Sequence, residues 1–344
     1  MNDKSFLIEI DQVLQSVEII SSTSLEFLDN SYSTKGNLLE DGSSFHKADR
    51  PIVLLLRDLL YRVFHCRQPY SSEWNTLSVT PSTDSRDLLE ALSAANMGAG
   101  TWEPDWEIKN LERGGSLLAI HKNGLTLWVP STQFLSVDGI NAIGKKGSVK
   151  MTKEYRKLLP GFYMAVGNIP AENNDSIIVR LYWNIKPSHA PLLMRFITTD
   201  LNGMSIPFHL KILGNPNLYP RADAGVLYIK KPYLPEAAEI LLKIYHQVRS
   251  YLYPSTPLFA KMLYPGMSLA EDPIPNDRNE SFGQNRSRIL AESIHSAYKK
   301  KLTTKNKKIL EIRSHFRKLN LDIERPYLNP LSSDDYDDLF SGRH

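Results

Sequence analysis

The chain has 344 residues, of which 42% are hydrophobic and 23% carry a charge. These values are typical of a soluble globular protein with one large or two modest domains. The net charge of +3 is too small to indicate nucleic acid as a partner. No apolar run approaches the roughly 18 residues of a membrane-spanning helix, and a signal peptide is not expected at the N-terminus. We therefore expect no membrane partner.

The chain contains a single cysteine, Cys66. One thiol excludes an intrachain disulfide and a cysteine-based metal cluster, and it is compatible with a reducing compartment. A cytoplasmic location is therefore expected. Secretion by a type III system stays open, because such signals have no sharp sequence pattern.

Residues 1–110 are predicted to form a mainly helical region. An amphipathic pattern covers 6–20, Pro51 opens an apolar segment that runs to Cys66, and a third helix is expected over 82–95. The apolar side chains of the second segment are predicted to be core residues. This region shows no catalytic constellation, so a docking surface for a peptide or partner is its expected use.

Strand patterns begin near Gly115, where Asn123-Gly124 separates two apolar runs and predicts a hairpin. Further strands are expected over 162–167, 176–185, 208–213 and 225–230, and helices over 153–159, 191–202 and 236–253. The predicted fold class is therefore α+β, with a mainly antiparallel central sheet from roughly 115 to 230 that helices flank at both ends.

The two strands between residues 208 and 230 carry most of the candidate functional groups. Alternation places His209 and Lys211 on one face of the first strand, and Tyr228 and Lys230 on one face of the second. Arg221 precedes the second strand. An imidazole, two ammoniums, a phenol and a guanidinium suit a dianionic phosphate and a proton transfer, although two strands with solvated cationic faces would look much the same.

Two further segments add arginines to this set. In the strand over 176–185, Arg180 shares a face with Tyr182 and Asn184, where it could line a polar cleft or face water. After a long loop over 254–279, Arg286 and Arg288 lie in the first turn of a predicted helix. The backbone N–H groups there favour an anion, but solvated arginines are equally common at such positions.

The C-terminal part is predicted to contain a basic helix over 301–325 and a disordered tail over 326–344. A basic helix could bind an acidic peptide, but no aromatic stacking pattern accompanies the lysines. A solvated helical face is the favoured interpretation.

Two ordered groups of residues resemble the signatures of the HopA-type family of type III secretion effectors. The first group is Pro207-Phe208-x-x-Lys211, Tyr219-x-Arg221-x-Asp223 and Val226-Leu227-Tyr228; the second is Lys261, Pro265-Gly266, Ala270-Glu271-Asp272-Pro273 and Ser281-Phe282-Gly283-x-x-Arg286. That family is related to the phosphothreonine lyases and to the lyases of thioviridamide-like and class V lanthipeptide pathways. The resemblance covers roughly residues 160–295, within a predicted lyase-like α+β domain over 111–300.

The resemblance implies a phosphoserine or phosphothreonine lyase. Such an enzyme eliminates phosphate from a phosphorylated precursor peptide to give dehydroalanine or dehydrobutyrine, together with a separate kinase-like phosphotransferase and without a metal or organic cofactor. Under this hypothesis Lys211 is the base or enolate stabiliser, and His209 is the acid to the leaving phosphate. The remaining candidates are the rival bases Lys261 and Lys230, the phenol of Tyr228, and the phosphate ligands Arg221, Arg286, Arg180 and Arg288.

One departure leaves the two main roles open. The phosphothreonine lyases place lysine two residues before their histidine acid, whereas His209 precedes Lys211 here. The acid and base assignments could therefore be interchanged or lie on other strands. The alternative function is a non-catalytic effector or scaffold that binds a phosphopeptide in the same cleft. The identity of the peptide and the preference for serine or threonine also stay open.

Overall fold

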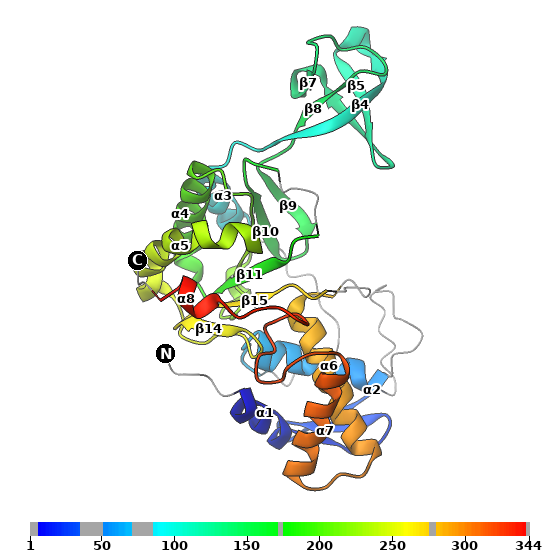
Figure 1. The fold of residues 1–344 in the computed structure, drawn as a ribbon, viewed down its shortest axis with the longest axis vertical. Helices are drawn as coiled ribbons and strands as arrows, with labels where there is room; N and C mark the ends of the chain where they lie inside the picture. The colour runs from blue at the N-terminus through cyan, green and yellow to red at the C-terminus, as the bar shows by residue number, and fades with distance from the viewer. Residues whose placement is uncertain (1–5, 35–50, 71–84, 171–174, 275–279, 342–344) are drawn as a thin grey trace.

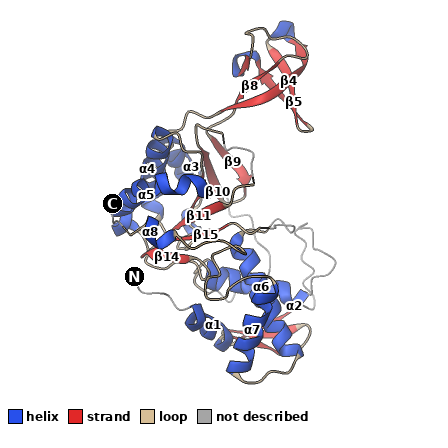
Figure 2. Cartoon of the chain, viewed as in Figure 1, coloured by secondary structure: helices blue, strands red, loops and turns tan. Residues whose placement is uncertain are grey.

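The structure, a computed structural model, describes residues 6–34, 51–70, 85–170, 175–274 and 280–341 (Figure 1). A central antiparallel sheet carries helices on both faces, and a smaller sheet lies apart at one end of the molecule (Figure 2). The predicted α+β class is confirmed. Within the described ranges, no helix has the length and apolar character that crossing a membrane requires.

The central sheet has seven strands. They are β9 (Glu154–Leu159), β10 (Phe162–Val166), β11 (Ile178–Trp183), β12 (His209–Leu213), β13 (Gly225–Lys230), β14 (Lys261–Tyr264) and β15 (Met267–Glu271). Their order across the sheet is β14-β15-β11-β13-β12-β10-β9, and every neighbouring pair is antiparallel. The strands that carry the first signature, β12 and β13, therefore lie side by side near the middle.

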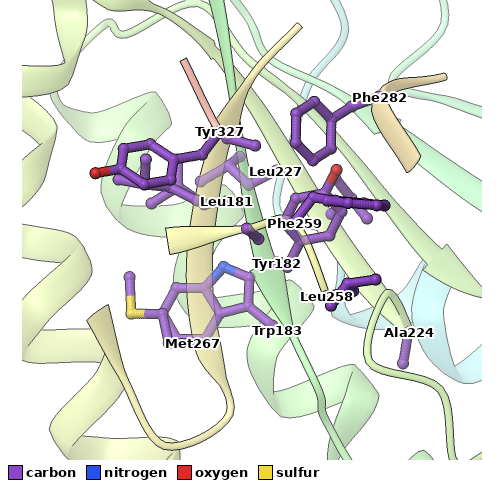
Figure 3. Close-up of a cluster of buried hydrophobic side chains, with 14 of the residues drawn as sticks. Leu181, Tyr182, Trp183, Ala224, Leu227, Leu258, Phe259, Met267, Phe282 and Tyr327 are labelled. Atoms are coloured by element: carbon purple, nitrogen blue, oxygen red, sulfur yellow. The ribbon is translucent and has the colours of Figure 1, made fainter. Parts of the chain in front are cut away.

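One face of the central sheet is apolar and lies under α3 (Arg86–Ala95), α4 (Ala190–Gly203) and α5 (Leu234–Val248) (Figure 1). Leu181, Leu210 and Leu227 point to this face and are completely buried. Figure 3 shows Leu181 and Leu227 among other buried side chains of this core. Because alternate residues of a strand face opposite ways, the polar residues between these leucines point to the other face.

The other face is partly covered by α2 (Pro51–Leu60), the π-helix η1 (Tyr61–His65) and α6 (Phe282–Lys299). α2 packs along α6, and α7 (Lys305–Lys318) packs on α6 in turn. Further N-terminal elements extend this layer: α1 (Phe6–Gln15), β1 (Val17–Ile19), β2 (Ser24–Phe27) and β3 (Asn30–Ser33). The three strands form a small antiparallel sheet, so the region predicted to be helical over 1–110 is mixed.

The smaller sheet, here called the β-module (residues 102–150), has its own core. Its strands are β4 (Trp102–Glu112), β5 (Leu117–Lys122), β6 (Leu125–Pro130), β7 (Phe134–Ser136) and β8 (Lys146–Lys150). Asn123 and Gly124 both have positive φ, as a tight turn between paired strands requires, so the hairpin predicted there is confirmed. The predicted sheet over 115–230 is therefore divided between two separate sheets.

Two segments differ locally from their predictions. Residues 154–159 form β9 rather than a helix, because Pro160-Gly161 turns the chain back and pairs this segment with β10. The long loop expected over 254–279 contains the β14–β15 hairpin, which Gly266 closes with a positive φ of 78°.

The C-terminal segment is also ordered where disorder was predicted. Residues 326–341 run back along the central sheet and include α8 (Tyr336–Leu339), while 342–344 lie outside the described residues. Tyr336 and Phe340 are fully buried, and the Tyr336 hydroxyl donates to Oε1 of the buried Glu271 at 2.7 Å. The acidic composition suggested a solvated tail, but these two aromatic side chains anchor it.

Candidate functional site

The sheet register brings candidate residues from three adjacent strands onto one face. Tyr228 of β13 is paired with Arg180 of β11 on one side and with His209 of β12 on the other. Lys211 lies two residues after His209 and therefore on the same face. The alternation predicted within each strand and the register of the sheet together assemble these four side chains, although 48 positions separate Arg180 from Tyr228.

Two aromatic rings link three of the cations. The Tyr228 ring has Arg180 Cζ at 5.0 Å and Lys211 Nζ at 5.9 Å from its centroid. The Phe162 ring has Lys211 Nζ at 4.5 Å and Arg221 Cζ at 5.9 Å. We call Arg180, Lys211 and Arg221 the cation cluster. The rings stabilise the three positive charges while keeping them apart.

Both arginines of the cation cluster already hold a carboxylate. Arg221 Nε and Nη2 each donate to Asp223 at 2.8 Å, which is a bidentate fork. Arg180 Nε donates to Asp272 at 2.7 Å. Burial alone would raise the pKa of Asp223, but the Arg221 guanidinium outweighs it and the pKa lies well below its ordinary value. Asp223 is therefore ionised and fixes the orientation of Arg221.

Lys211 differs from the two arginines. Its side chain is half-buried, and its ammonium has no hydrogen-bond or ion-pair partner among the described residues. The negative charge of Asp223 acts on it only at longer range. Lys211 is therefore the cation of this cluster whose charge is not already paired with a carboxylate in the described part of the chain.

The arginines of the second signature do not join the cluster. Arg286 is 2% exposed, and its guanidinium donates to the carbonyls of Pro326 at 2.8 Å and Leu328 at 3.0 Å. Arg288 is paired with Glu280 and Glu292. The expectation that Arg221 and Arg286 line one cleft is therefore wrong, because Arg286 fastens the C-terminal segment and solvent does not reach it.

Lys261, a rival base, also lies elsewhere. Its register partner on β15 is Leu269, which pairs with Leu181 on the apolar face of the sheet, opposite the cluster. The ammonium of Lys261 is 2.7 Å from Asp337 and 3.2 Å from Asp334 of the C-terminal segment. Its position on the wrong face and its two carboxylate partners exclude it as the base for a substrate at the cluster.

A pocket adjoins the cluster, with a cavity volume of about 860 Å³. His209, Tyr228 and Lys230 line it on the side of the central sheet, and the β-module forms the opposite wall. His209 keeps contact with solvent, yet desolvation by the surrounding protein lowers its pKa below the ordinary value. Desolvation therefore favours the neutral form of the His209 ring, and a bound anion would favour its protonation.

His65 is a neighbour of the cluster that the sequence analysis missed. It ends η1, is 2% exposed, stacks on Tyr61 at 5.4 Å and meets the Tyr182 ring edge-on at 5.8 Å. Its Nδ1 has no hydrogen-bond partner among the described residues. Burial lowers the pKa of His65 to about 3, the charge of Arg180 adds to this, and Asp223 opposes it. In the sequence, His65 lies in an apolar segment predicted to be helical, so the local pattern gives no sign of a functional residue. The π-helical turn seen in the structure is the feature that marks it.

The low pKa of His65 predicts a pH-dependent stability. Between pH 6.5 and 3 the unfolded chain binds a proton at this ring that the folded chain does not, so stability falls as the pH falls through this window. The expected slope is about 1.4 kcal/mol per pH unit. Urea unfolding at pH 5 and 7 should show this loss in the wild type, and His65→Gln should lack it.

Equal slopes in the two proteins would contradict the prediction. A second measurement applies if His65→Gln does not fold. In the wild type, the NMR signal of the His65 ring should stay constant from pH 7 to pH 5, whereas a free histidine titrates in this range.

Comparisons with known proteins identify the family. A model of the HopA1 effector protein family matches residues 154–328, just over half of the chain.

Two solved effector proteins of Pseudomonas syringae are similar in structure. That of pv. tomato strain DC3000 is 19% identical, with 79% of this chain and 89% of that chain covered and a TM-score of 0.44. That of pv. syringae strain 61 is 14% identical, with coverages of 79% and 88% and a TM-score of 0.43. No curated protein sequence matches the chain. The matched region contains both signatures and every strand of the central sheet, and the chain belongs to the HopA1 effector protein family.

Proposed function

We propose that this protein eliminates phosphate from phosphoserine or phosphothreonine in a peptide, with the cation cluster as the reaction site. The observation that carries the proposal is Lys211, an ammonium without a carboxylate partner in the described part of the chain, held between two aromatic rings and flanked by two arginines. A phosphate monoester carries about −1.5 to −2 charges near neutral pH and suits such a site.

The two arginines are proposed to position the phosphate. Arg180 and Arg221 each use Nε and Nη2 on an aspartate, and their Nη1 groups have no acceptor among the described residues. The aspartates hold the two guanidinium planes, and the remaining N–H groups are available to phosphate oxygens. Positioning in this way consumes no proton-transfer group.

In the proposed reaction the Lys211 ammonium first releases its proton to solvent, and the neutral amine then removes the proton from Cα of the substrate. The electrons of the Cα–H bond form the Cα=Cβ double bond, and the Cβ–O bond breaks with its electron pair leaving on phosphate. His209, two residues away on the same face, gains a proton beside the phosphate dianion and returns it to the leaving group. Tyr228 separates Lys211 from Arg180, and its phenol is the second candidate donor; Lys230, which lines the pocket, is the rival base.

The substrate must arrive already phosphorylated. Because elimination of phosphate requires a phosphorylated side chain, we propose that a kinase-like phosphotransferase acts on the same peptide before this protein does. The expected products are dehydroalanine from phosphoserine and dehydrobutyrine from phosphothreonine, together with inorganic phosphate. No cofactor takes part in the proposed steps.

Mass spectrometry of a synthetic phosphothreonine peptide tests the proposal. The wild-type protein should convert it to the dehydrated peptide without added metal, and phosphate should appear in equal amount. An intact peptide after incubation, with and without the kinase-like partner, would remove the lyase proposal.

The second candidate function is phosphopeptide binding without turnover. The Arg221–Asp223 and Arg180–Asp272 pairs favour it, because both arginines are partly neutralised and rigidly held, as in a recognition site. Tight binding of the phosphopeptide with no dehydrated product would support this function over the lyase.

Arg221→Lys is expected to weaken phosphopeptide binding by about tenfold to a hundredfold, since a charge-assisted hydrogen bond is worth roughly 1.5–3 kcal/mol. Lysine keeps the charge but loses the fork that engages Asp223 and phosphate together. Fluorescence anisotropy with a labelled phosphopeptide measures the change. Arg313→Lys, at a surface pair with Glu324 remote in sequence from the cluster, is the matched control and should bind as the wild type does. Equal affinities for the two variants would contradict the role given to Arg221.

A further inference from the structure

The pocket beside the cation cluster lies between two parts of the chain that pack little against each other. Its floor is the central sheet, with His209, Tyr228 and Ile178, and its opposite wall comes from the start of β4 and the tip of the β5–β6 hairpin. Figure 1 shows the β-module standing away from the central sheet, joined to it only where β4 begins and β8 ends. The pocket is therefore open to a chain that passes between the two sheets.

The pocket is lined largely by apolar side chains on the side of the central sheet. Phe208 and Ile178 contribute to the floor, and Ile169 on the neighbouring loop is 39% exposed. On the β-module side, Lys122 donates to Glu103 at 2.9 Å and to the carbonyl of Pro104 at 2.8 Å, so its charge is already compensated. The pocket thus favours apolar side chains rather than a second phosphate.

Tyr228 connects the pocket to the cation cluster. Its side chain lines the pocket, and the same ring has Arg180 and Lys211 against it. Residues two apart on a strand, such as His209 and Lys211, are about 7 Å apart, which is also the advance of an extended peptide over two residues. A peptide whose phosphate lies at the cluster therefore reaches the pocket with the second or third residue from the phosphorylated one.

We propose that this pocket binds the residues that flank the phosphorylated serine or threonine, as an extended apolar segment of the substrate peptide. The pocket, rather than the cation cluster, then selects which peptide is used. Its volume of about 860 Å³ lies within the range of pockets that enclose small ligands. The inference rests on the proposed function, since the phosphate site fixes where the flanking residues lie.

Three labelled probes and two variants test the inference by fluorescence anisotropy. The probes are a nonapeptide with central phosphothreonine flanked by leucine, isoleucine and valine, its unphosphorylated form, and a phosphothreonine tripeptide with glycine on both sides. Ile169→Gln makes the pocket polar at an exposed position, so folding is not at risk. Ile143→Gln, at a 64% exposed isoleucine of the β-module outside the pocket, is the matched control.

The wild type should bind the phosphorylated nonapeptide at least tenfold more tightly than the tripeptide. Ile169→Gln should remove most of this difference without changing the affinity for the tripeptide, and Ile143→Gln should change neither. Equal affinities of the wild type for the two phosphorylated probes would overturn the inference, as would equal behaviour of the two variants.

The unphosphorylated nonapeptide separates this inference from the proposed function. If it binds as tightly as the phosphorylated form and loses affinity in Ile169→Gln, the pocket proposal stands and the phosphate site is wrong. If the tripeptide binds and neither nonapeptide binds more tightly than the tripeptide, the phosphate site stands and the pocket proposal is wrong. If no probe binds, both are wrong.

Discussion

Replacing Lys211 with alanine is expected to lower the rate of phosphate elimination by about 10²–10⁴-fold, because the proposed general base is lost. Phosphopeptide affinity should fall by no more than about tenfold, since Arg180 and Arg221 remain in place. Lys211→Arg should be as inactive as the alanine variant, because a guanidinium keeps its proton near neutral pH. Mass spectrometry of the dehydrated peptide and anisotropy of the labelled peptide measure the two effects separately.

Lys230→Ala tests the rival base in the same assay. Lys230 lines the pocket two residues beyond Tyr228 on β13, and its removal should leave the elimination rate within a factor of a few. An active Lys211→Ala together with an inactive Lys230→Ala would transfer the role of base to Lys230. Loss of binding in Lys211→Ala, equal to its loss of turnover, would instead make Lys211 a phosphate ligand.

Replacing Arg286 with lysine is expected to destabilise the fold by about 3 kcal/mol, with little direct effect on phosphate binding. Burial lowers the pKa of Arg286 to about 10, because removing the guanidinium charge from water is unfavourable. Its hydrogen bonds to the Pro326 and Leu328 carbonyls offset this desolvation. A lysine ammonium cannot satisfy both carbonyls in the same geometry, and a lost charge-assisted hydrogen bond costs roughly 1.5–3 kcal/mol.

Urea unfolding gives the change in the free energy of unfolding, and limited proteolysis should show earlier cleavage within residues 326–341. Arg313→Lys, at the exposed pair with Glu324, is the control and should stay within about 0.5 kcal/mol of the wild type. If Arg286→Lys were as stable as the wild type but bound phosphopeptide weakly, the role of phosphate ligand predicted from the sequence would be restored.

The central strands were predictable because their local pattern and their environment agree. β11, β12 and β13 alternate between polar residues on one face and buried apolar residues on the other, so their extent and the residues that share a face within each strand followed from period two. The pairing of Tyr228 with Arg180 and with His209 depends on the register of the sheet, which the sequence pattern did not predict. The same is true of α5, whose apolar positions follow the helical repeat.

Other features depend on partners far away in the chain. The position of Arg286 at a helix start suggests an anion, but its acceptors are carbonyls 40 and 42 residues further on. The acidic C-terminal segment has the composition of a disordered tail, and Lys261 and Glu271 are what hold it. His65 stands at the end of an apolar helix, and nothing in its local sequence indicates that it ends beside Asp223 and Arg180.

The packing of α2 against α6 has a consequence for how the protein is made. The two helices are separated by more than 200 residues, and α2 exposes a continuous apolar surface until α6 covers it. One edge of β11 likewise stays unpaired until β15 has been synthesised. During translation, the apolar surface of α2 is therefore exposed until α6 has been synthesised, and one edge of β11 stays unpaired until β15 follows. Such surfaces are sites of aggregation, so chaperone occupancy during translation should end only after residue 299 has emerged.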